Sequence, residues 1–251
     1  MRGFQEQARE CTVGVAFLPD EMIMFKNRDL STDVIAKNLF SFYDGPRFRA
    51  LRAVNLKTKE GEGVSIGVNR DGVCVANTHV VTTPDPPYDA LCEEILAKAR
   101  ARGDVPRIAR AYVKAHALQG GRMLVASVGW GYLIEVFRHT LKIEELRGNR
   151  AITNHFALVP RREAAPRGST ANSRARERAA SRLLSGVAGI QDVENLLRTH
   201  TPWKGPVSIC RHGRYYSTES SHIIRIAGRR ITWSHLVGRP CEHAYRTVTV
   251  V

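Results

Sequence analysis

The sequence predicts an α+β fold in which antiparallel sheets are covered by pairs of helices. Three observations favour this class. Strand-like segments come in runs, two pairs of helix-like segments separate those runs, and the strand-helix alternation of a parallel α/β fold is missing. With 251 residues, 43% of them hydrophobic, the chain can bury a sizeable core, and no repeat, low-complexity segment or linker divides it.

The first third of the chain is expected to be almost entirely β. Pro19 and Asp20 supply the turn chemistry of a hairpin, and Asn69-Arg70-Asp71-Gly72 supplies a second turn. Around these turns, β-forming residues predict strands at 11–18, 21–27, 49–57, 63–69 and in the run VCVANTHVV, which ends at residue 81. Cys11 therefore stands at the head of the first hairpin.

Two helix pairs are expected in the remainder. Leu91 and Ile95 recur at helical spacing after the proline-rich residues 83–87, and a second helix starts near Pro106. The other pair is expected at about 172–184 and 190–199. Strands are expected at 122–128, 131–138, 150–158 and from 206 to the end.

The charge is strongly positive, at +14 from 38 basic and 24 acidic residues, which invites a nucleic-acid interpretation. The basic residues are scattered, however, without a basic tail, zinc-finger spacing or aromatic-basic RNA-binding motif. We therefore prefer a solvated arginine-rich surface and expect no nucleic-acid partner. A non-catalytic nucleic-acid-binding protein stays as an alternative.

No segment of the sequence predicts contact with a membrane. No run approaches the roughly 20 apolar residues of a membrane helix, and residues 1–10 lack the apolar core of a signal peptide. A cytoplasmic protein is expected, and whether it forms a homo-oligomer is left open.

Five cysteines form no CxxC pair, and their odd number leaves at least one thiol unpaired. This argues against a zinc site, and we expect no metal and no cofactor. Cys74, Cys92 and Cys210 lie in apolar segments, where a free cysteine usually behaves as a small hydrophobic residue. Cys11 and Cys241 do not lie inside such apolar segments, so this interpretation does not cover them.

The position of Cys11 suggests chemistry. A thiol attacks an amide carbonyl only if a base accepts its proton. If the bond between Glu10 and Cys11 is cut, the freed α-amine, with a pKa of about 7.7 to 8.0, can serve as that base. Residues 1–10 would then be a leader removed by autocatalytic cleavage, and residues 11–251 the mature chain.

Seven short motifs follow one another along the chain: Cys11-Thr12, Asn27-Arg28-Asp29, Gly72 to Asn77, Thr153-Asn154-His155-Phe156, Ser169 to Arg174, Ser208 to His212 and Gly238 to Cys241. In this order they resemble the cysteine branch of the N-terminal nucleophile (Ntn) hydrolases. Within it they look like the acyl-coenzyme A:isopenicillin N acyltransferase-like family, which is related to choloylglycine hydrolase and penicillin V acylase. The resemblance runs from residue 11 to about 245 and implies a single domain with a four-layer αββα sandwich.

The resemblance also implies roles around the nucleophile Cys11. Asp29 would hold and polarise the freed α-amine, although an aspartate there could also form a turn. We take Arg28 as the active-site cation, because it matches the arginine of many acyltransferase-like members, whereas the bile-salt hydrolase branch has its arginine at the position of Lys26. Because neighbours alternate faces along a strand, Lys26 and Arg28 share a face that Asp29 does not, unless the strand has ended.

Three more residues receive roles from the resemblance. Asn77 and Asn154 would form the oxyanion hole, one through a backbone N–H and the other through its side-chain amide. Asn154 could instead cap a strand. Arg174 would brace the nucleophile and Asp29, with a solvated helix arginine as the alternative.

The expected function is hydrolysis of a small linear amide, or transfer of its acyl group, through an acyl-enzyme on Cys11. The sequence does not distinguish hydrolysis from transfer and does not identify the substrate. One alternative is a cysteine hydrolase or peptidase that keeps its leader and uses His155 as the base.

Overall fold

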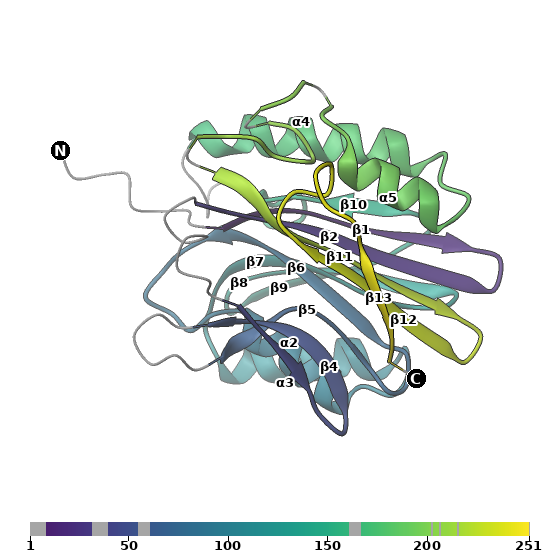
Figure 1. Ribbon diagram of the computed structural model, residues 1–251. Helices are drawn as coiled ribbons and strands as arrows, with labels where there is room; N and C mark the ends of the chain where they lie inside the picture. Colours follow the sequence, from purple (N-terminus) through teal and green to yellow (C-terminus); the bar gives the residue numbers. More distant parts are fainter. Residues whose placement is uncertain are drawn as a thin grey trace.

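The structure is a computed structural model, which describes residues 9–31, 40–54, 61–160, 167–201, 203–205, 207–214 and 216–250. In these residues the chain forms two antiparallel sheets packed face to face, with a pair of helices on the outer side of each sheet (Figure 1). The four-layer αββα arrangement expected from the sequence is confirmed.

The first sheet contains the hairpin that begins with Cys11. Its strands, in spatial order, are β10 (Arg150–Ile152), β1 (Arg9–Leu18), β2 (Glu21–Ser31), β11 (Tyr216–Ala227), β12 (Arg230–Val237) and β13 (Arg246–Thr249). Helices α4 (Arg167–Leu184) and α5 (Ile190–Arg198) cover this sheet (Figure 1). The β1–β2 turn places Asp20 at a φ of 57°, a conformation that aspartate tolerates better than most residues.

The second sheet carries the other helix pair, α2 (Asp89–Lys98) and α3 (Asp104–Ala115). Its strands, in order, are β3 (Phe40–Asp44), β4 (Phe48–Val54), β5 (Gly61–Asn69), β6 (Cys74–Val81), β7 (Leu118–Ser127), β8 (Trp130–Arg138) and β9 (Thr140–Glu145).

Alternation along the first hairpin sorts its side chains into two cores. Val13 and Met24 face the second sheet and pack in the core between the sheets, together with Cys11. Ile23 and Phe25 face the other way, into the core beneath α4 and α5. Because the period of a strand is two residues, the position of Cys11 on β1 decides that its thiol enters the space between the sheets.

The expected strand at 150–158 is shorter than the sequence suggested. It ends at Ile152, and the carboxylate of Glu135 accepts the backbone N–H groups of Ala157, Leu158 and Val159. A side chain thus takes the hydrogen bonds that a neighbouring strand would have supplied. This leaves Asn154 in a loop beside β1.

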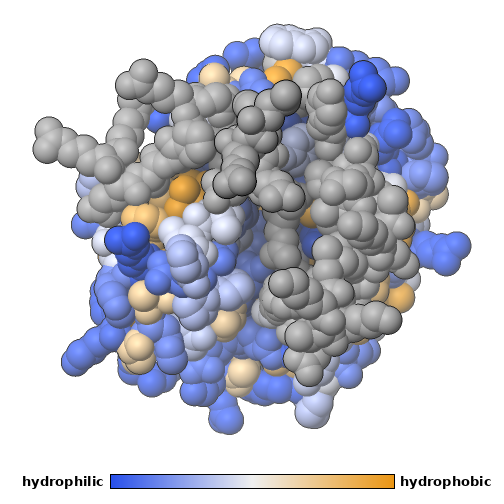
Figure 2. Space-filling view, turned by 90° about the vertical axis from the view of Figure 1, so that its left-hand side faces the viewer, coloured by the Kyte–Doolittle hydropathy of each residue, from blue (hydrophilic) through white to orange (hydrophobic). Residues whose placement is uncertain are grey.

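The surface agrees with the scattered charge of the sequence. One face of the molecule is mostly hydrophilic where it is coloured, with small groups of apolar side chains between (Figure 2). None of the described helices is both long enough and apolar enough to span a bilayer.

Candidate active site

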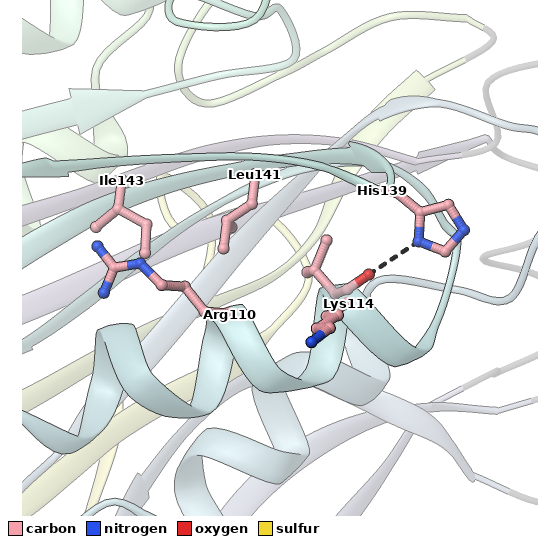
Figure 3. A pocket seen from close by; sticks show the side chains of 6 residues that line it. Arg110, Lys114, His139, Leu141 and Ile143 are labelled. Carbon is pink, nitrogen blue, oxygen red and sulfur yellow. Dashed lines mark hydrogen bonds between the residues drawn. The ribbon is translucent and has the colours of Figure 1, made fainter.

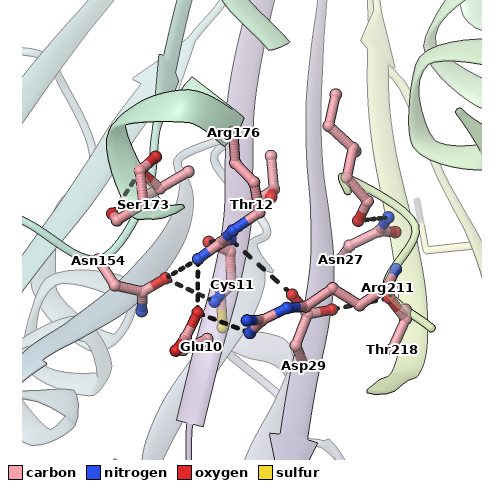
Figure 4. A network of polar contacts seen from close by, with 12 residues as sticks. Glu10, Cys11, Thr12, Asn27, Asp29, Asn154, Ser173, Arg176, Arg211 and Thr218 are labelled. Carbon is pink, nitrogen blue, oxygen red and sulfur yellow. Dashed lines mark hydrogen bonds and ion pairs between the residues drawn. The ribbon is translucent and has the colours of Figure 1, made fainter. Parts of the chain in front are cut away.

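Cys11 lies on β1 with its backbone held on both sides. Its N–H donates to Asn154 Oδ1 at 2.9 Å, and its carbonyl accepts from Arg176 Nη1 at 2.9 Å (Figure 4). The residue is 4% exposed, and its side chain belongs to the core between the sheets. The backbone on which a freed α-amine would form is therefore fixed by a polar cluster, while the side chain of Cys11 points into the space between the two sheets.

Asn154 is placed by the short strand β10, which pairs with β1. Its Oδ1 also accepts from Arg176 Nη2 at 3.1 Å, and its Nδ2 donates to the carbonyl of His79 at 2.7 Å. The structure thus brings Asn154 to Cys11, as the sequence predicted, but the contact is an acceptor contact on the backbone N–H. One N–H of the amide is engaged by His79, and the other is the candidate donor to an oxyanion.

Arg176, rather than Arg174, is the α4 arginine that contacts Cys11. Its guanidinium is fully buried and also lies 3.2 Å from Thr12 Oγ1 and 3.9 Å from Asp29 Oδ2. Two residues of a helix differ by about 200° around its axis, so only one of the two arginines can face β1. The sequence assigned this role to Arg174. Helical spacing would have indicated Arg176, because it lies one turn before Ala180, which packs in the core beneath α4 and α5, and so it shares the buried face of the helix.

Glu10 forms the shortest ionic contacts of the cluster. Its Oε2 accepts from Arg176 Nη2 at 2.8 Å and from Arg211 Nη1 at 2.6 Å, and the residue is 7% exposed (Figure 4). Arg211 comes from the loop before β11. Sequence reasoning treated Glu10 as part of a leader and did not single out Arg211, because no local pattern joins residues about 200 positions apart.

Asp29 lies within β2, which continues to Ser31, so it does not form a turn. It pairs with Glu10 across the hairpin and so faces α4, away from the Cys11 thiol. Its Oδ1 accepts from Thr218 Oγ1 at 2.8 Å, whereas its buried Oδ2 has no hydrogen-bond partner among the described residues. A buried acceptor of this kind is costly, and a new donor close by would relieve it.

Burial raises the pKa of Asp29 from 3.8 to about 6, against the opposing effect of Arg211 and Arg176, and the Glu10 carboxylate adds to the rise. A carboxyl whose pKa is higher in the folded chain binds more protons there than in the unfolded chain. Its contribution to stability is therefore complete below about pH 4 and is lost as the pH rises through about 6.

Lys26 and Arg28 both share the face of Cys11, because Arg28 pairs with Cys11 and Lys26 with Val13. Arg28 Nη1 bonds to Glu219 Oε2 at 2.9 Å in a buried ion pair. Lys26 crosses to the second sheet, where its Nζ donates to Ser65 Oγ at 2.7 Å. Burial lowers the pKa of Lys26, and the charge of Cys11 opposes this. The sequence favoured Arg28, but the charge of Arg28 is paired with Glu219, whereas the hydrogen-bond partners of Lys26 Nζ in the described residues are neutral oxygens of Ser65 and Asn77. Lys26 is thus the better candidate for a cation beside the thiol.

Asn77 uses its side chain away from Cys11. Its Nδ2 donates to the Val64 carbonyl at 2.6 Å and to Asp89 Oδ1 at 3.1 Å, and its own carbonyl accepts from Lys26 Nζ at 2.8 Å. These contacts satisfy the buried amide and anchor Lys26. An oxyanion role for Asn77 could use its backbone N–H, since its side-chain donors are engaged.

In the described residues, His155, the candidate base of the alternative mechanism, contacts residues of α4 and not Cys11. Its Nδ1 is 2.8 Å from Ser173 Oγ and its Nε2 is 3.7 Å from Glu177 Oε2. Burial lowers the pKa of His155 to about 4. Within the described part of the chain, no hydrogen bond or ion pair joins its ring to Cys11.

A pocket of about 520 Å³ opens elsewhere, between α3 and β9 (Figure 3). Among its described lining residues are Arg110, Lys114 and His139, and His139 Nδ1 donates to the Val113 carbonyl at 3.0 Å. This pocket lies on the helix side of the second sheet, so it does not belong to the cluster around Cys11.

In the described parts of the chain, the arrangement of two sheets and four helices is the sandwich fold of the Ntn hydrolases. Three solved structures share it at low sequence identity. The *Caenorhabditis elegans* ortholog of N-acylethanolamine-hydrolyzing acid amidase is 14% identical with a TM-score of 0.57, over 85% of this chain and 92% of that one. A conjugated bile acid hydrolase variant from *Clostridium perfringens* is 10% identical with a TM-score of 0.59, over 95% and 92%.

Penicillin V acylase from *Agrobacterium tumefaciens* is 12% identical with a TM-score of 0.56, over 90% of this chain and 82% of that one. No protein-family model matches the chain, and no curated protein matches its sequence. At these identities the comparisons establish the fold.

Proposed function

We propose that this protein is an Ntn amidohydrolase that cleaves small linear amides through an acyl-enzyme on Cys11, in the acyltransferase-like group of that class. The observation that carries the proposal is that Asn154 and Arg176 hydrogen-bond to the backbone N–H and carbonyl of Cys11. Any buried backbone N–H and C=O must be hydrogen-bonded, but at Cys11, beyond the end of the β10 pairing at Val13, the partners are a side-chain amide and a buried guanidinium, which makes the surroundings of a freed α-amine polar. The fold shared with three amide-cleaving enzymes supports the same conclusion.

Activation is the first step of the proposed function. The Cys11 sulfur attacks the carbonyl carbon of Glu10, the peptide C–N bond breaks, and the nitrogen takes up the thiol proton. Water then hydrolyses the resulting thioester and releases residues 1–10. Arg176 and Arg211 hold the Glu10 side chain during this step, so that the scissile peptide is positioned next to the thiol.

Turnover uses the freed α-amine of Cys11 as base and acid. It accepts the thiol proton, the sulfur attacks the amide carbonyl, and the amine product leaves after the α-ammonium returns the proton. Water, or an amine acceptor in a transfer reaction, then takes the acyl group. Asp29 Oδ2, a buried acceptor, orients the α-ammonium, and Lys26 stabilises negative charge at the sulfur.

The substrate class follows from the fold neighbours, whose names describe hydrolysis of N-acylethanolamines, conjugated bile acids and penicillin V. We propose an amide of this general kind, with no cofactor.

Intact-mass analysis and an acyl-amide screen test the proposal together. We expect a mature chain of 241 residues (251 minus 10) and release of amine from at least one acyl-amide. Cys11→Ala should stay full length and inactive. An active preparation in which all chains are full length would overturn the α-amine mechanism.

The alternative with an intact leader is distinguished by His155→Gln. Since the His155 ring contacts Ser173 and Glu177, we expect the variant to keep its turnover within a few-fold once folded. Loss of turnover equal to that of Cys11→Ala, in a folded chain, would favour a Cys-His pair instead.

A further inference from the structure

Two cysteines and two histidines from three separate segments converge beside the Arg211 loop. The four are His200, Cys210, His212 and Cys241, and their ligand atoms all lie within 4.8 Å of one another. His200 follows α5, Cys210 and His212 flank Arg211, and Cys241 lies in the turn after β12. None of them belongs to the proposed amidohydrolase mechanism.

Four of the six distances between these atoms are close to the edges of a tetrahedral zinc site. Zn–S bonds of about 2.3 Å and Zn–N bonds of about 2.0 to 2.1 Å place tetrahedral ligand atoms roughly 3.3 to 3.8 Å apart. His212 Nε2 lies 3.1 Å from His200 Nε2, 3.2 Å from Cys241 Sγ and 3.6 Å from Cys210 Sγ, and the two sulfurs are 3.5 Å apart. Four of the six edges thus lie within a few tenths of an ångström of the expected range.

The backbone holds these groups in place from outside the cluster. Cys210 N–H donates to the Thr199 carbonyl at 3.0 Å, and His212 N–H donates to the Gly205 carbonyl at 3.1 Å. The two imidazoles meet edge to face with their planes inclined at 75°, and their Nε2 atoms lie side by side at 3.1 Å. The turn that carries Cys241 begins at Gly238, whose φ of 98° suits glycine.

A second layer of contacts surrounds His212. Arg239 Nη1 donates to its Nδ1 at 2.9 Å and also bonds to Glu242 Oε1 at 2.9 Å, while Glu242 Oε1 lies 3.9 Å from the same Nδ1. A metal on Nε2 requires the proton on Nδ1, where a carboxylate is the usual acceptor. In the present arrangement Arg239 donates to Nδ1, so metal binding requires the guanidinium to move aside and Glu242 to take its place as the acceptor of the Nδ1 proton.

We propose that this chain binds one Zn²⁺ through Cys210, Cys241, His200 and His212. Two thiolates and two imidazoles form the donor set that zinc favours in structural sites. The ion would tie the end of α5 and the turn after β12 to the loop that carries Arg211. In the precursor it would thereby hold Arg211 against Glu10, the residue before the bond to be cut.

Cobalt titration tests the site, because Co²⁺ bound to thiolates in a tetrahedral site absorbs strongly in the visible range. The full chain is reduced, stripped with a chelator and titrated with Co²⁺, and zinc bound after reconstitution is counted by elemental analysis. We expect one metal per chain and an absorption band that Zn²⁺ displaces. Cys241→Ala should lose the band, and because Cys241 is exposed this variant should fold. Cys74→Ala, which removes a thiol from the core between the sheets, is the matched control and should keep it.

A second variant addresses the outer contacts. Glu242→Gln should bind the metal about 10- to 100-fold more weakly with the same stoichiometry. Substoichiometric metal in the wild type, equal metal content in Cys241→Ala, or a Cys210–Cys241 disulfide that persists in reductant would each overturn the proposal.

Discussion

Replacing Glu10 by glutamine should slow the activating cut without altering the enzyme that the cut produces. The Glu10 carboxylate accepts two charge-assisted hydrogen bonds, from Arg176 and from Arg211, and both guanidiniums are at most 3% exposed. Glutamine is nearly the same size and keeps one acceptor oxygen, but it removes the charge that fixes the residue before the scissile bond.

The size of the effect follows from those two contacts. A hydrogen bond to a charged group contributes about 1.5 to 3 kcal/mol, and the amide oxygen of glutamine keeps the equivalent of one of the two bonds. A net loss of about 1.5 to 3 kcal/mol remains. If all of it appears in the barrier to cleavage, the cut slows by roughly 10- to 160-fold, since each 1.36 kcal/mol is a factor of ten in rate.

The assay is the time course of leader loss, followed by intact mass after pulse translation. Glu145→Gln is the matched control, because Glu145 pairs with Arg102 at the surface and should leave the cut unchanged. Mature chains from wild type and Glu10→Gln have the same sequence, so their activity per mature chain should be equal. Cleavage of Glu10→Gln at the wild-type rate would refute the positioning role of Glu10. If the two mature chains differ in mass or in activity, the cut falls at another bond.

Two further pairs of variants test the neighbours of Cys11. Lys26→Met should slow alkylation of Cys11 by iodoacetamide about tenfold at fixed pH, corresponding to roughly 1.4 kcal/mol of lost charge stabilisation, whereas Arg28→Lys should react close to wild type. Equal rates in both variants would remove Lys26 from the mechanism. Arg176→Lys should reduce amide turnover about 100-fold, because a lysine cannot reproduce the forked contacts and a shift of about 1 Å has that cost. Arg174→Lys should stay within about threefold, and a comparable loss there would return the bracing role to Arg174.

The sequence predicted the parts of the fold that local patterns encode. The β1–β2 hairpin follows from two alternating runs around Pro19-Asp20, and the layer order follows from runs of strands separated by helix pairs. The strand expected at 150–158 was cut short at Ile152, because a distant carboxylate takes its backbone hydrogen bonds. A local β pattern does not reveal such a competitor.

The candidate site was harder to predict, since its contacts join distant segments. Asn154 was found through its motif, but the choice between Arg174 and Arg176 depended on the rotation of one helix. The cysteine-histidine cluster was missed for a related reason. Zinc-site spacing rules look for neighbouring cysteines, whereas Cys210 and Cys241 meet through the β11–β12 hairpin.

Because the pKa of Asp29 is raised, the stability of the precursor depends on pH, and this dependence should become smaller after the cut. The rise from 3.8 to about 6 corresponds to about 3 kcal/mol of stability, lost as the pH increases from about 4 to 6. His155 acts in the opposite sense: its pKa, lowered from 6.5 to about 4, makes the chain lose stability as the pH falls through that range. The Asp29 contribution must therefore be measured as a difference between Asp29→Asn and its parent, both in the Cys11→Ala precursor.

We expect that difference, measured by urea unfolding at pH 4 to 7, to change by about 3 kcal/mol across the range. Removal of Glu10 takes away a carboxylate that raises the pKa of Asp29 and leaves Arg176 and Arg211, which lower it. A chain that begins at residue 11 should accordingly hold Asp29 ionised at a lower pH, which is the state that can bind an α-ammonium. If the difference is the same with and without residues 1–10, Glu10 does not control the charge of Asp29, and the cut serves only to release the amine.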